Sequence, residues 1–251
     1  MSTRTAIITG ASRGIGRNTA LSIAQRGTDI IITFRSSAWE AETLIAEVEA
    51  LGRNAAAFQL DTGDIRGFDR FVDEIRNTLQ RWGRDRFDDL VNNAGNSLHV
   101  NIDQMTEQLF DDVVNVHFKG VYFLTQKLLP LMNDGGHIVN ISSGLTRVSV
   151  PGSSAYAAAK GAVEVFTRYL AKELGPRRIT ANVVAPGPVQ TDFSDGMVRD
   201  NPEVNEQVSA MTALGRPAVV DDIGPMIAGL LSDDNRWVNA QRIEVSGGLA
   251  L

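Results

Sequence analysis

The chain alternates short apolar runs with longer stretches of helical periodicity, and this alternation limits the fold more than any other feature. Apolar runs that predict strands lie at residues 5–9, 29–33, 55–59, 89–91, 137–141, 180–184 and 242–245. Helical patterns lie between them at residues 15–25, 38–51, 65–82, 105–132 and 221–231, the fourth of these in one piece or two. Strands that alternate with helices are typical of βαβ units, whose parallel sheets are covered on both faces. We therefore predict an α/β fold, a doubly wound, Rossmann-like parallel sheet in three layers.

One domain is expected to span residues 1–251. A chain of 251 residues with 43% hydrophobic content can bury a substantial core, and no repeat, low-complexity segment or linker divides it. Residues 192–215 are polar, contain glycine and show only weak helical periodicity. Because such a segment suits a mobile cover over a pocket better than a core element, we predict a substrate-loop flap there.

Charge and cysteine content argue against several classes of protein. The net charge is −6 and the basic residues are scattered, so neither nucleic acid nor a membrane surface is the expected partner. The absence of cysteine excludes disulfides and thiolate metal sites and fits a reducing compartment. No apolar run approaches the roughly 20 residues that cross a bilayer, so a cytoplasmic protein is expected. His99, His117 and His137 are too dispersed to indicate a metal site.

The turn after the first predicted strand reads TGASRGIG and contains Gly10, Gly14 and Gly16. Glycines at this place let the chain turn sharply and let the backbone approach a pyrophosphate at a helix N-terminus. The spacing departs from the GxGxxG fingerprint, and a plain strand-to-helix turn is the alternative. The strand before it and the helix after it favour a nucleotide site.

The end of the second predicted strand indicates which dinucleotide would bind. A carboxylate there would bond the ribose diol of NAD, but Phe34 is followed by Arg35, and Arg13 lies inside the glycine loop. Two guanidinium groups without a facing acid favour a 2′-phosphate, so NADP(H) is the predicted cofactor. The alternative is that both arginines are ordinary solvated surface charges.

A phenol, an ammonium and a hydroxyl are expected to meet further along the chain. Tyr156 and Lys160 stand four residues apart in an Ala-rich helical run, which puts both on one face, and Ser143 follows the preceding strand. A fixed cation favours the phenolate and so moves the pKa of a tyrosine toward the neutral range. This set suits proton transfer at a substrate oxygen, although a Tyr-x-x-x-Lys pair alone can also be a surface contact.

The glycine loop, NNAG at residues 92–95, Ser143, Tyr156, Lys160 and Pro186-Gly187 stand in this order. Together they resemble the short-chain dehydrogenase/reductase family over almost the entire chain, and most closely its single-domain NADP-using branch, which includes 3-oxoacyl-thioester reductases. The resemblance implies that Tyr156 is the acid in carbonyl reduction and the base in alcohol oxidation, that Lys160 bonds the nicotinamide ribose, and that Ser143 orients the carbonyl. It also implies a cofactor site made of Gly10, Ser12, Arg13, Gly14, Ile15, Gly16, Arg35, Asp61, Thr62, Asn92, Ala94, Gly95, Tyr156, Lys160, Pro186, Gly187, Val189 and Thr191.

Two regions depart from the family pattern. The family usually has a catalytic asparagine three positions before the glycine of the central helix, and this chain has His117 there, before Gly120. A histidine can donate and accept through its two ring nitrogens, so His117 is a candidate relay residue, with a packing role as the alternative. In the C-terminal third, GRPAVVDDI and NAQRIEVSGG replace the patterns GRxGxPxDI and TGxxxxVDGG. Relatives use these regions for subunit contacts and for the substrate loop.

The expected activity is therefore NADP(H)-dependent interconversion of a carbonyl and a secondary alcohol by hydride transfer, with Ser143, Tyr156, Lys160 and His117 as catalytic candidates and no metal. The alternative is a non-catalytic protein that senses NADPH or serves as a scaffold.

The expected partner is a small carbonyl or alcohol substrate, with an acyl thioester as one option. In that case Arg147 and Arg199 would provide a basic entrance for an acidic carrier protein. Residues 149–153 and 192–211, with apolar Val148, Val150, Phe193 and Met197, are expected to line the substrate pocket. A homo-oligomer, tetramer or dimer, is expected from the resemblance.

Overall fold

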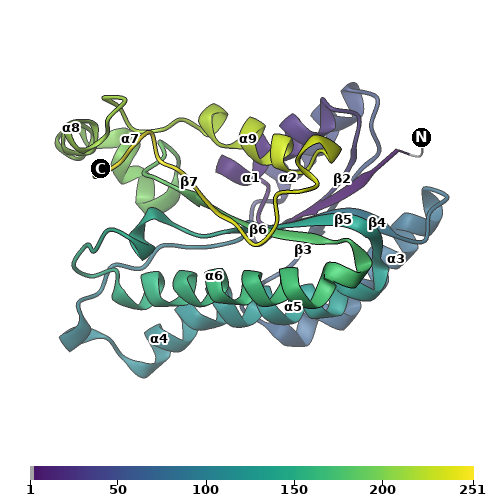
Figure 1. Cartoon of the computed structure of the whole chain (residues 1–251), viewed down its shortest axis with the longest axis horizontal. Coiled ribbons are helices and arrows are strands. Elements are labelled where there is room, and N and C mark those ends of the chain that lie inside the picture. Colours follow the sequence, from purple (N-terminus) through teal and green to yellow (C-terminus); the bar gives the residue numbers. More distant parts are fainter. Residues whose placement is uncertain (1–2) are drawn as a thin grey trace.

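The sheet contains seven parallel strands in the order β3-β2-β1-β4-β5-β6-β7 (Figure 1). The computed structural model describes residues 3–251, and residues 1 and 2 of the expected domain lie outside the described residues. The strands are β1 (Thr5–Ile8), β2 (Asp29–Phe34), β3 (Ala55–Gln59), β4 (Phe87–Asn92), β5 (Met132–Ile141), β6 (Thr180–Pro186) and β7 (Arg242–Val245). The chain runs outward from β1 to β3 and returns to place β4 on the other side of β1. This reversal opens a crevice at the carboxyl ends of β1 and β4, where doubly wound sheets bind ligands.

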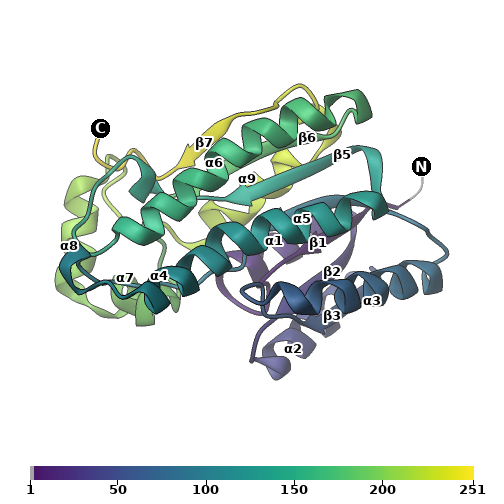
Figure 2. The ribbon, with the colours of Figure 1, turned by 90° about the horizontal axis from the view of Figure 1, so that it is seen from below.

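Helices cover both faces of the sheet, as Figures 1 and 2 show. One face carries α1 (Gly14–Ala24), α2 (Ala38–Ala50) and α9 (Gly224–Leu230). The other carries α3 (Phe68–Arg81), α5 (Gly120–Leu128) and α6 (Ser154–Leu174). Three further helices, α4 (Glu107–Val114), α7 (Met197–Asp200) and α8 (Pro202–Met211), lie beyond the carboxyl ends of the strands. The predicted three-layer, doubly wound α/β fold is confirmed.

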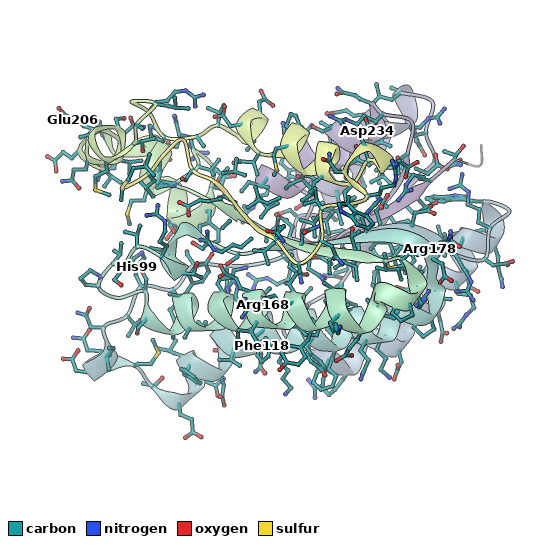
Figure 3. The ribbon with its side chains drawn as sticks, in the orientation of Figure 1. His99, Phe118, Arg168, Arg178, Glu206 and Asp234 are labelled. Carbon is teal, nitrogen blue, oxygen red and sulfur yellow. The ribbon has the colours of Figure 1, made fainter. Side chains whose placement is uncertain are left out.

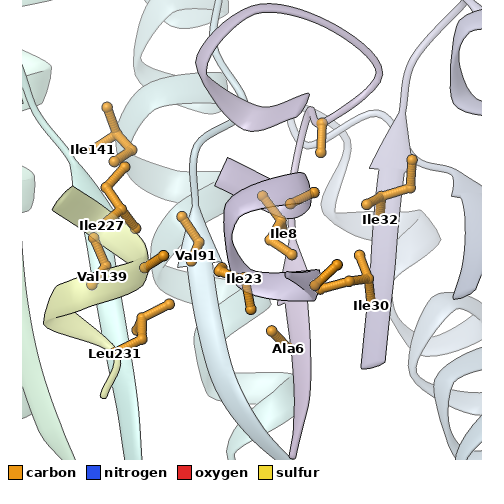
Figure 4. Packing of buried hydrophobic residues seen from close by; sticks show 14 of the residues in the cluster. Ala6, Ile8, Ile23, Ile30, Ile32, Val91, Val139, Ile141, Ile227 and Leu231 are labelled. Atoms are coloured by element: carbon orange, nitrogen blue, oxygen red, sulfur yellow. The ribbon is translucent and has the colours of Figure 1, made fainter. Parts of the chain in front are cut away.

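The central strands are apolar on both faces because each face is covered. Within β2, Ile30 and Ile32 pack against α1, while Ile31 between them packs against the opposite helices. Ile8 on β1 and Ile227 on α9 belong to the first of these two cores (Figure 4). A side chain alternates between faces along a strand, so continuous apolar runs in the sequence produce two cores around one sheet.

Two predicted elements contain features that the sequence pattern did not reveal. The stretch predicted as helix over 105–132 contains α4, a π-helical turn (Asn115–Lys119) and α5, then a short 3₁₀ turn before β5 begins at Met132. A π turn has one more residue than a turn of α-helix, so it changes the direction in which the following side chains point. A search for apolar residues at a period of 3.6 does not reveal this change.

The flap contains more helix than its periodicity indicates. The side chain of Asn201 accepts hydrogen bonds from the backbone N–H groups of Glu203 and Val204, and Pro202 occupies the first helical position of α8. Asparagine at the cap followed by proline is a strong helix start, so the signal lies in the NP pair and not in the apolar period. The far end of the flap is held by backbone hydrogen bonds from Ala213 to Gly248 and from Leu214 to Gly247.

Neither a membrane-spanning helix nor a metal-binding cluster is found within residues 3–251. Throughout this range, none of the helices combines the length and the apolar character that a bilayer span requires. The same range contains no cluster of three or more His, Asp or Glu side chains placed to hold a metal ion.

Two helical glycines provide a matched test of close packing. A Cβ atom added at Gly120 would lie 1.9 Å from the carbonyl oxygen of Thr62, whereas at Gly161 in α6 nothing lies within 4 Å. Gly120→Ala should therefore lower the free energy of unfolding by about 2–3 kcal/mol, because backbone atoms must move. Gly161→Ala should be neutral or stabilising by up to about 1 kcal/mol, because alanine is the better helix former. Urea denaturation of both variants measures the difference; equal effects would contradict the packing shown here.

Candidate active site

The glycine loop joins β1 to α1 at the centre of the crevice. Gly10 has a φ of +62°, and a Cβ atom there would lie 2.7 Å from the Cα of Ala94. At Gly16 a Cβ atom would lie 2.6 Å from the carbonyl oxygen of Gly10. The amide of Asn93 donates to the carbonyl oxygens of Thr9 and Gly10, both at 2.9 Å. Only glycine fits such a loop, and its backbone is therefore open to an approaching ligand.

Two arginines stand at the outer end of this loop. Arg35 follows β2, and Arg13 precedes the first turn of α1, which contains no acidic residue. Both arginines are exposed, and neither forms an ion pair with any residue of the described chain. Two guanidinium groups beside a helix N-terminus provide the positive charge that favours an anion such as a phosphate.

A cavity of about 490 Å³ runs from the two arginines, past the glycine loop, to Tyr156. It is lined by every predicted site residue except Asn92 and Gly187. The amide of Asn92 instead donates to Thr125 at 3.0 Å and to Asn140 at 2.8 Å, which joins β4, α5 and β5 in the protein interior. A Cβ atom at Gly187 would lie 3.0 Å from the Cα of Ser246, so this glycine permits close chain packing.

Tyr156, Lys160 and Ser143 open into one end of this cavity. The ammonium of Lys160 lies 5.7 Å from the centre of the Tyr156 ring and donates to the carbonyl oxygen of Ile141 at 2.7 Å. Burial lowers the pKa of Lys160 to about 8. Burial also raises the pKa of Tyr156 to about 12, although the Ser143 hydroxyl acts in the opposite direction. The phenol is thus protonated at neutral pH and can donate a proton; burial, and not the expected effect of Lys160, dominates its pKa.

A charged network fixes the backbone on either side of Ser143. Glu164 on α6 accepts hydrogen bonds from Ser142 at 2.7 Å, from Thr146 at 2.8 Å and from Arg242 of β7 at 2.8 Å. The Ser143 hydroxyl accepts a hydrogen bond from the N–H of Leu145 at 3.2 Å. These contacts join the loop that contains Ser143 to α6 and to the edge of the sheet, so they position its hydroxyl beside the phenol.

His117 lies in the π turn, only 1% exposed, with its ring edge against the Tyr156 ring at 4.8 Å between centres. Its Nε2 lies 2.9 Å from both the carbonyl oxygen and the side-chain oxygen of Asn96, so the tautomer with the proton on Nε2 suits these contacts and leaves Nδ1 as an acceptor. Burial, reinforced by the charge of Lys160, lowers the pKa of His117 to about 3. The imidazole is therefore neutral at physiological pH.

Glycine at position 95 leaves space for the imidazole, since a Cβ atom there would lie 2.8 Å from Cε1 of His117.

Sequence reasoning assigned no role to Asn93 or Asn96, although NNAGN places both in the turn after β4. Of the apolar residues expected in the substrate pocket, Phe193 lines the cavity. Val148, Val150 and Met197 do not, and neither do residues 149–153.

Comparisons with known proteins identify the family. The family model described as "Enoyl-(Acyl carrier protein) reductase" matches residues 10–250. The chain is 36% identical to the 3-oxoacyl-[acyl-carrier-protein] reductase FabG of Staphylococcus aureus (strain Mu50), over 98% of each chain. It is 34% identical to the hydroxynaphthalene reductase-like protein Arp2 of Metarhizium brunneum, over 98% of this chain and 94% of the relative.

A solved structure gives the same result. The angucycline C-6 ketoreductase LanV with bound NADP matches with a TM-score of 0.93 and 35% identity, over 98% of this chain and 95% of LanV. A further LanV structure holds NADP and rabelomycin. The chain therefore belongs to the short-chain dehydrogenase/reductase family. The prediction of an NADP(H)-dependent oxidoreductase for carbonyl and alcohol groups is confirmed at the level of this family, whereas the individual residue roles stay predictions.

The neutral state of His117 has a consequence for stability. In the unfolded chain a histidine takes up a proton near pH 6.5, but the folded protein resists this until about pH 3. The stability that depends on the neutral ring is present above pH 6.5 and is lost as the pH falls toward 3. In His117→Asn, the free energy of unfolding should therefore fall less steeply between these pH values. Urea denaturation at several pH values measures the slope, and equal slopes in both proteins would contradict a buried neutral ring.

The activity of a second variant, His117→Ala, tests the relay. If His117 passes protons to or from the site, His117→Ala should lower kcat by about tenfold or more, in the range usual for proton-transfer groups. An unchanged kcat between about pH 5 and pH 9 would remove His117 from the mechanism and leave it a packing role.

Proposed function

We propose that this protein reduces a ketone to a secondary alcohol with NADPH, and oxidises the alcohol with NADP⁺, in the cavity between the glycine loop and Tyr156. The observation that carries the proposal is that the phenol of Tyr156 and the glycine backbone line one continuous cavity. A proton donor and a dinucleotide cradle in the same space are what hydride transfer to a carbonyl requires.

The residues present suit the cofactor. Gly10 and Gly16 permit a close turn, because a Cβ atom at either would clash with Ala94 or with Asn93 and Gly10, and Gly14 has a positive φ. All three line the cavity together with the N-terminus of α1. Arg13 and Arg35 would hold a 2′-phosphate, and Asp61 and Thr62 at the end of β3 would contact the adenine end. Ala94, Gly95, Pro186, Val189 and Thr191 would line the remainder of the site, toward the nicotinamide. When bound, the nicotinamide supplies or accepts the hydride.

The side chains of the protein handle the substrate oxygen. Ser143 bonds the carbonyl oxygen and holds it beside the phenol, which fixes the carbonyl carbon toward the cofactor. Tyr156 donates its proton to this oxygen as negative charge develops there; in the reverse direction the phenolate accepts the proton of the alcohol. The positive charge of Lys160 stabilises the phenolate that forms. With its pKa raised to about 12, the phenol carries its proton at neutral pH, which is the state in which it acts as an acid.

A sensor or scaffold without catalysis is the weaker candidate. Such a protein needs the cofactor site but has no need for Ser143, Tyr156 and Lys160 to line the same cavity. The relatives are named as reductases, which also supports catalysis.

Three finer statements complete the proposal. Residues 192–215 act as a mobile flap, supported by four cavity-lining residues at positions 192–195 and by fixation at its far end. The protein forms a homo-oligomer, a tetramer or a dimer, supported by exposed Tyr122, Val165 and Tyr169 on the outer faces of α5 and α6. A cytoplasmic location rests on the lack of cysteine alone.

Tyr156→Phe tests the proton donor. The variant should bind NADPH with nearly unchanged affinity but lose about 10²-fold to 10⁴-fold in kcat, because the ring remains and the transferable proton does not. Fluorescence titration measures binding, and NADPH oxidation at 340 nm with a panel of ketones and diketones measures turnover. More than about a tenth of the wild-type kcat in the variant would refute Tyr156 as the acid.

Arg35→Ala tests the choice of cofactor. Loss of a guanidinium that bonds a phosphate should raise the Kd for NADPH about tenfold to a hundredfold and leave the Kd for NADH unchanged. Arg70→Ala, an exposed arginine on α3 away from the cavity, is the matched control. Equal weakening of both nucleotides, or a wild-type preference for NADH, would overturn the 2′-phosphate assignment.

A further inference from the structure

The flap concentrates negative charge at the substrate end of the cavity. Residues 192–215 contain five acidic residues and one arginine, a net charge of −4 out of −6 for the whole chain. The acidic residues are Asp192, Asp195, Asp200, Glu203 and Glu206. Asp192 and Asp195 line the cavity, and Glu206 projects from α8 at the outer end of the molecule (Figure 3).

The arginines in and beside the flap are already neutralised. Arg199 bonds Asp200 at 2.7 Å and also pairs with Asp192. Arg216 contacts the carboxylate of Asp222 at 2.6 and 2.9 Å. Neither guanidinium is available to an incoming anion.

Arg147, the other candidate for a basic mouth, is held in the same way. Its guanidinium bonds both carboxylate oxygens of Glu244, at 2.9 and 2.7 Å, and donates to the carbonyl oxygens of Leu249 and Ala250. A bidentate pair of this kind fixes the side chain as well as its charge. The arginines that were expected to attract an acidic partner to the cavity thus form ion pairs within the protein.

One aromatic side chain stands at the mouth beside the proton donor. Phe193 is 44% exposed, lines the cavity, and has its ring centre 6.3 Å from that of Tyr156. An exposed ring at this place offers an apolar face on which a flat aromatic molecule can stack. A side chain of this kind favours a substrate with an aromatic part.

From these observations we propose that the substrate is a free, uncharged ketone with a flat aromatic part, and not an acyl thioester carried on coenzyme A or on an acidic carrier protein. This inference rests on the proposed function and specifies its substrate class. A cavity entrance with net negative charge repels anions and slows their entry, and salt screens this repulsion. The matching relatives include reductases of both substrate types, so charge at the mouth is what separates them for this chain.

Two thioesters with the same reacting group isolate the effect of charge. Acetoacetyl-N-acetylcysteamine is uncharged, whereas acetoacetyl-CoA carries several phosphate charges. At an ionic strength of about 20 mM and saturating NADPH, kcat/KM for the neutral ester should exceed that for the CoA ester by about tenfold or more. The ratio should shrink when the ionic strength rises to about 0.3 M. A CoA ester that matches or exceeds the neutral ester at low salt would overturn the proposal.

A charge variant provides the matched control. Glu203→Gln/Glu206→Gln on α8 should raise kcat/KM for acetoacetyl-CoA several-fold and leave the neutral ester unchanged, because both residues lie outside the cavity lining. Glu42→Gln/Glu49→Gln on α2 removes the same charge far from the flap and should change neither value. An equal gain in both double variants would show that net charge matters and that the flap does not.

The aromatic part of the proposal has its own test. 2-Tetralone and 2-decalone share a carbonyl position and a size, but only the first contains an aromatic ring. The ratio of their kcat/KM values should favour 2-tetralone and should fall about fivefold in Phe193→Leu. An unchanged ratio would remove Phe193 from substrate recognition. If NADPH binds but neither ketone nor the neutral ester is reduced, the proposed function itself fails; if all are reduced without regard to charge or ring, only this inference fails.

Discussion

The arrangement of the site depends on a buried ammonium group. Lys160 is 3% exposed and has one direct partner among the described residues, the carbonyl oxygen of Ile141 at the end of β5. Burial removes water from the ammonium and lowers its pKa to about 8, so further oxygen ligands in the cavity would stabilise its charged form. The ribose hydroxyls of a dinucleotide are ligands of that kind. The lysine therefore links the end of β5 to the helix that contains Tyr156, and in the proposed function it also bonds the cofactor ribose.

The same burial explains how the phenol and the imidazole behave. Low polarity around Tyr156 and His117 disfavours charge on both, so the phenol keeps its proton and the imidazole takes none. In this state His117 can hold Asn96 and support the phenol ring, and Gly95 is the residue that makes this packing possible. A relay through His117 would have to pass through the neutral ring and its Nδ1 atom, which has no hydrogen-bond partner among the described residues.

The sequence was sufficient to predict the layers, the parallel sheet and the place of the glycine loop. Each depends on local signals: apolar runs set strands, and closely spaced glycines mark a loop that a side chain would obstruct. It was not sufficient for features that depend on three-dimensional packing. The π turn around His117 lies inside an unbroken apolar period, and the deep burial that raises the tyrosine pKa is not visible from a four-residue spacing. Asn92 belongs to a motif but points into the interior, since its partners Thr125 and Asn140 come from distant parts of the chain.

Residues 213–214 of the flap are hydrogen-bonded to residues 247–248. This attachment separates the part of the enzyme that selects substrates from the part that transfers hydride and proton. One end of the segment is bonded to residues that follow β7, while the other contains three consecutive left-handed residues, Ser194, Asp195 and Gly196. In the proposal made here, the acidic outer surface of α8 acts on molecules that approach the cavity without touching the reacting atoms. Selectivity can in this way diverge by substitutions on one surface helix, independently of the machinery for hydride and proton transfer, which makes the scaffold modular.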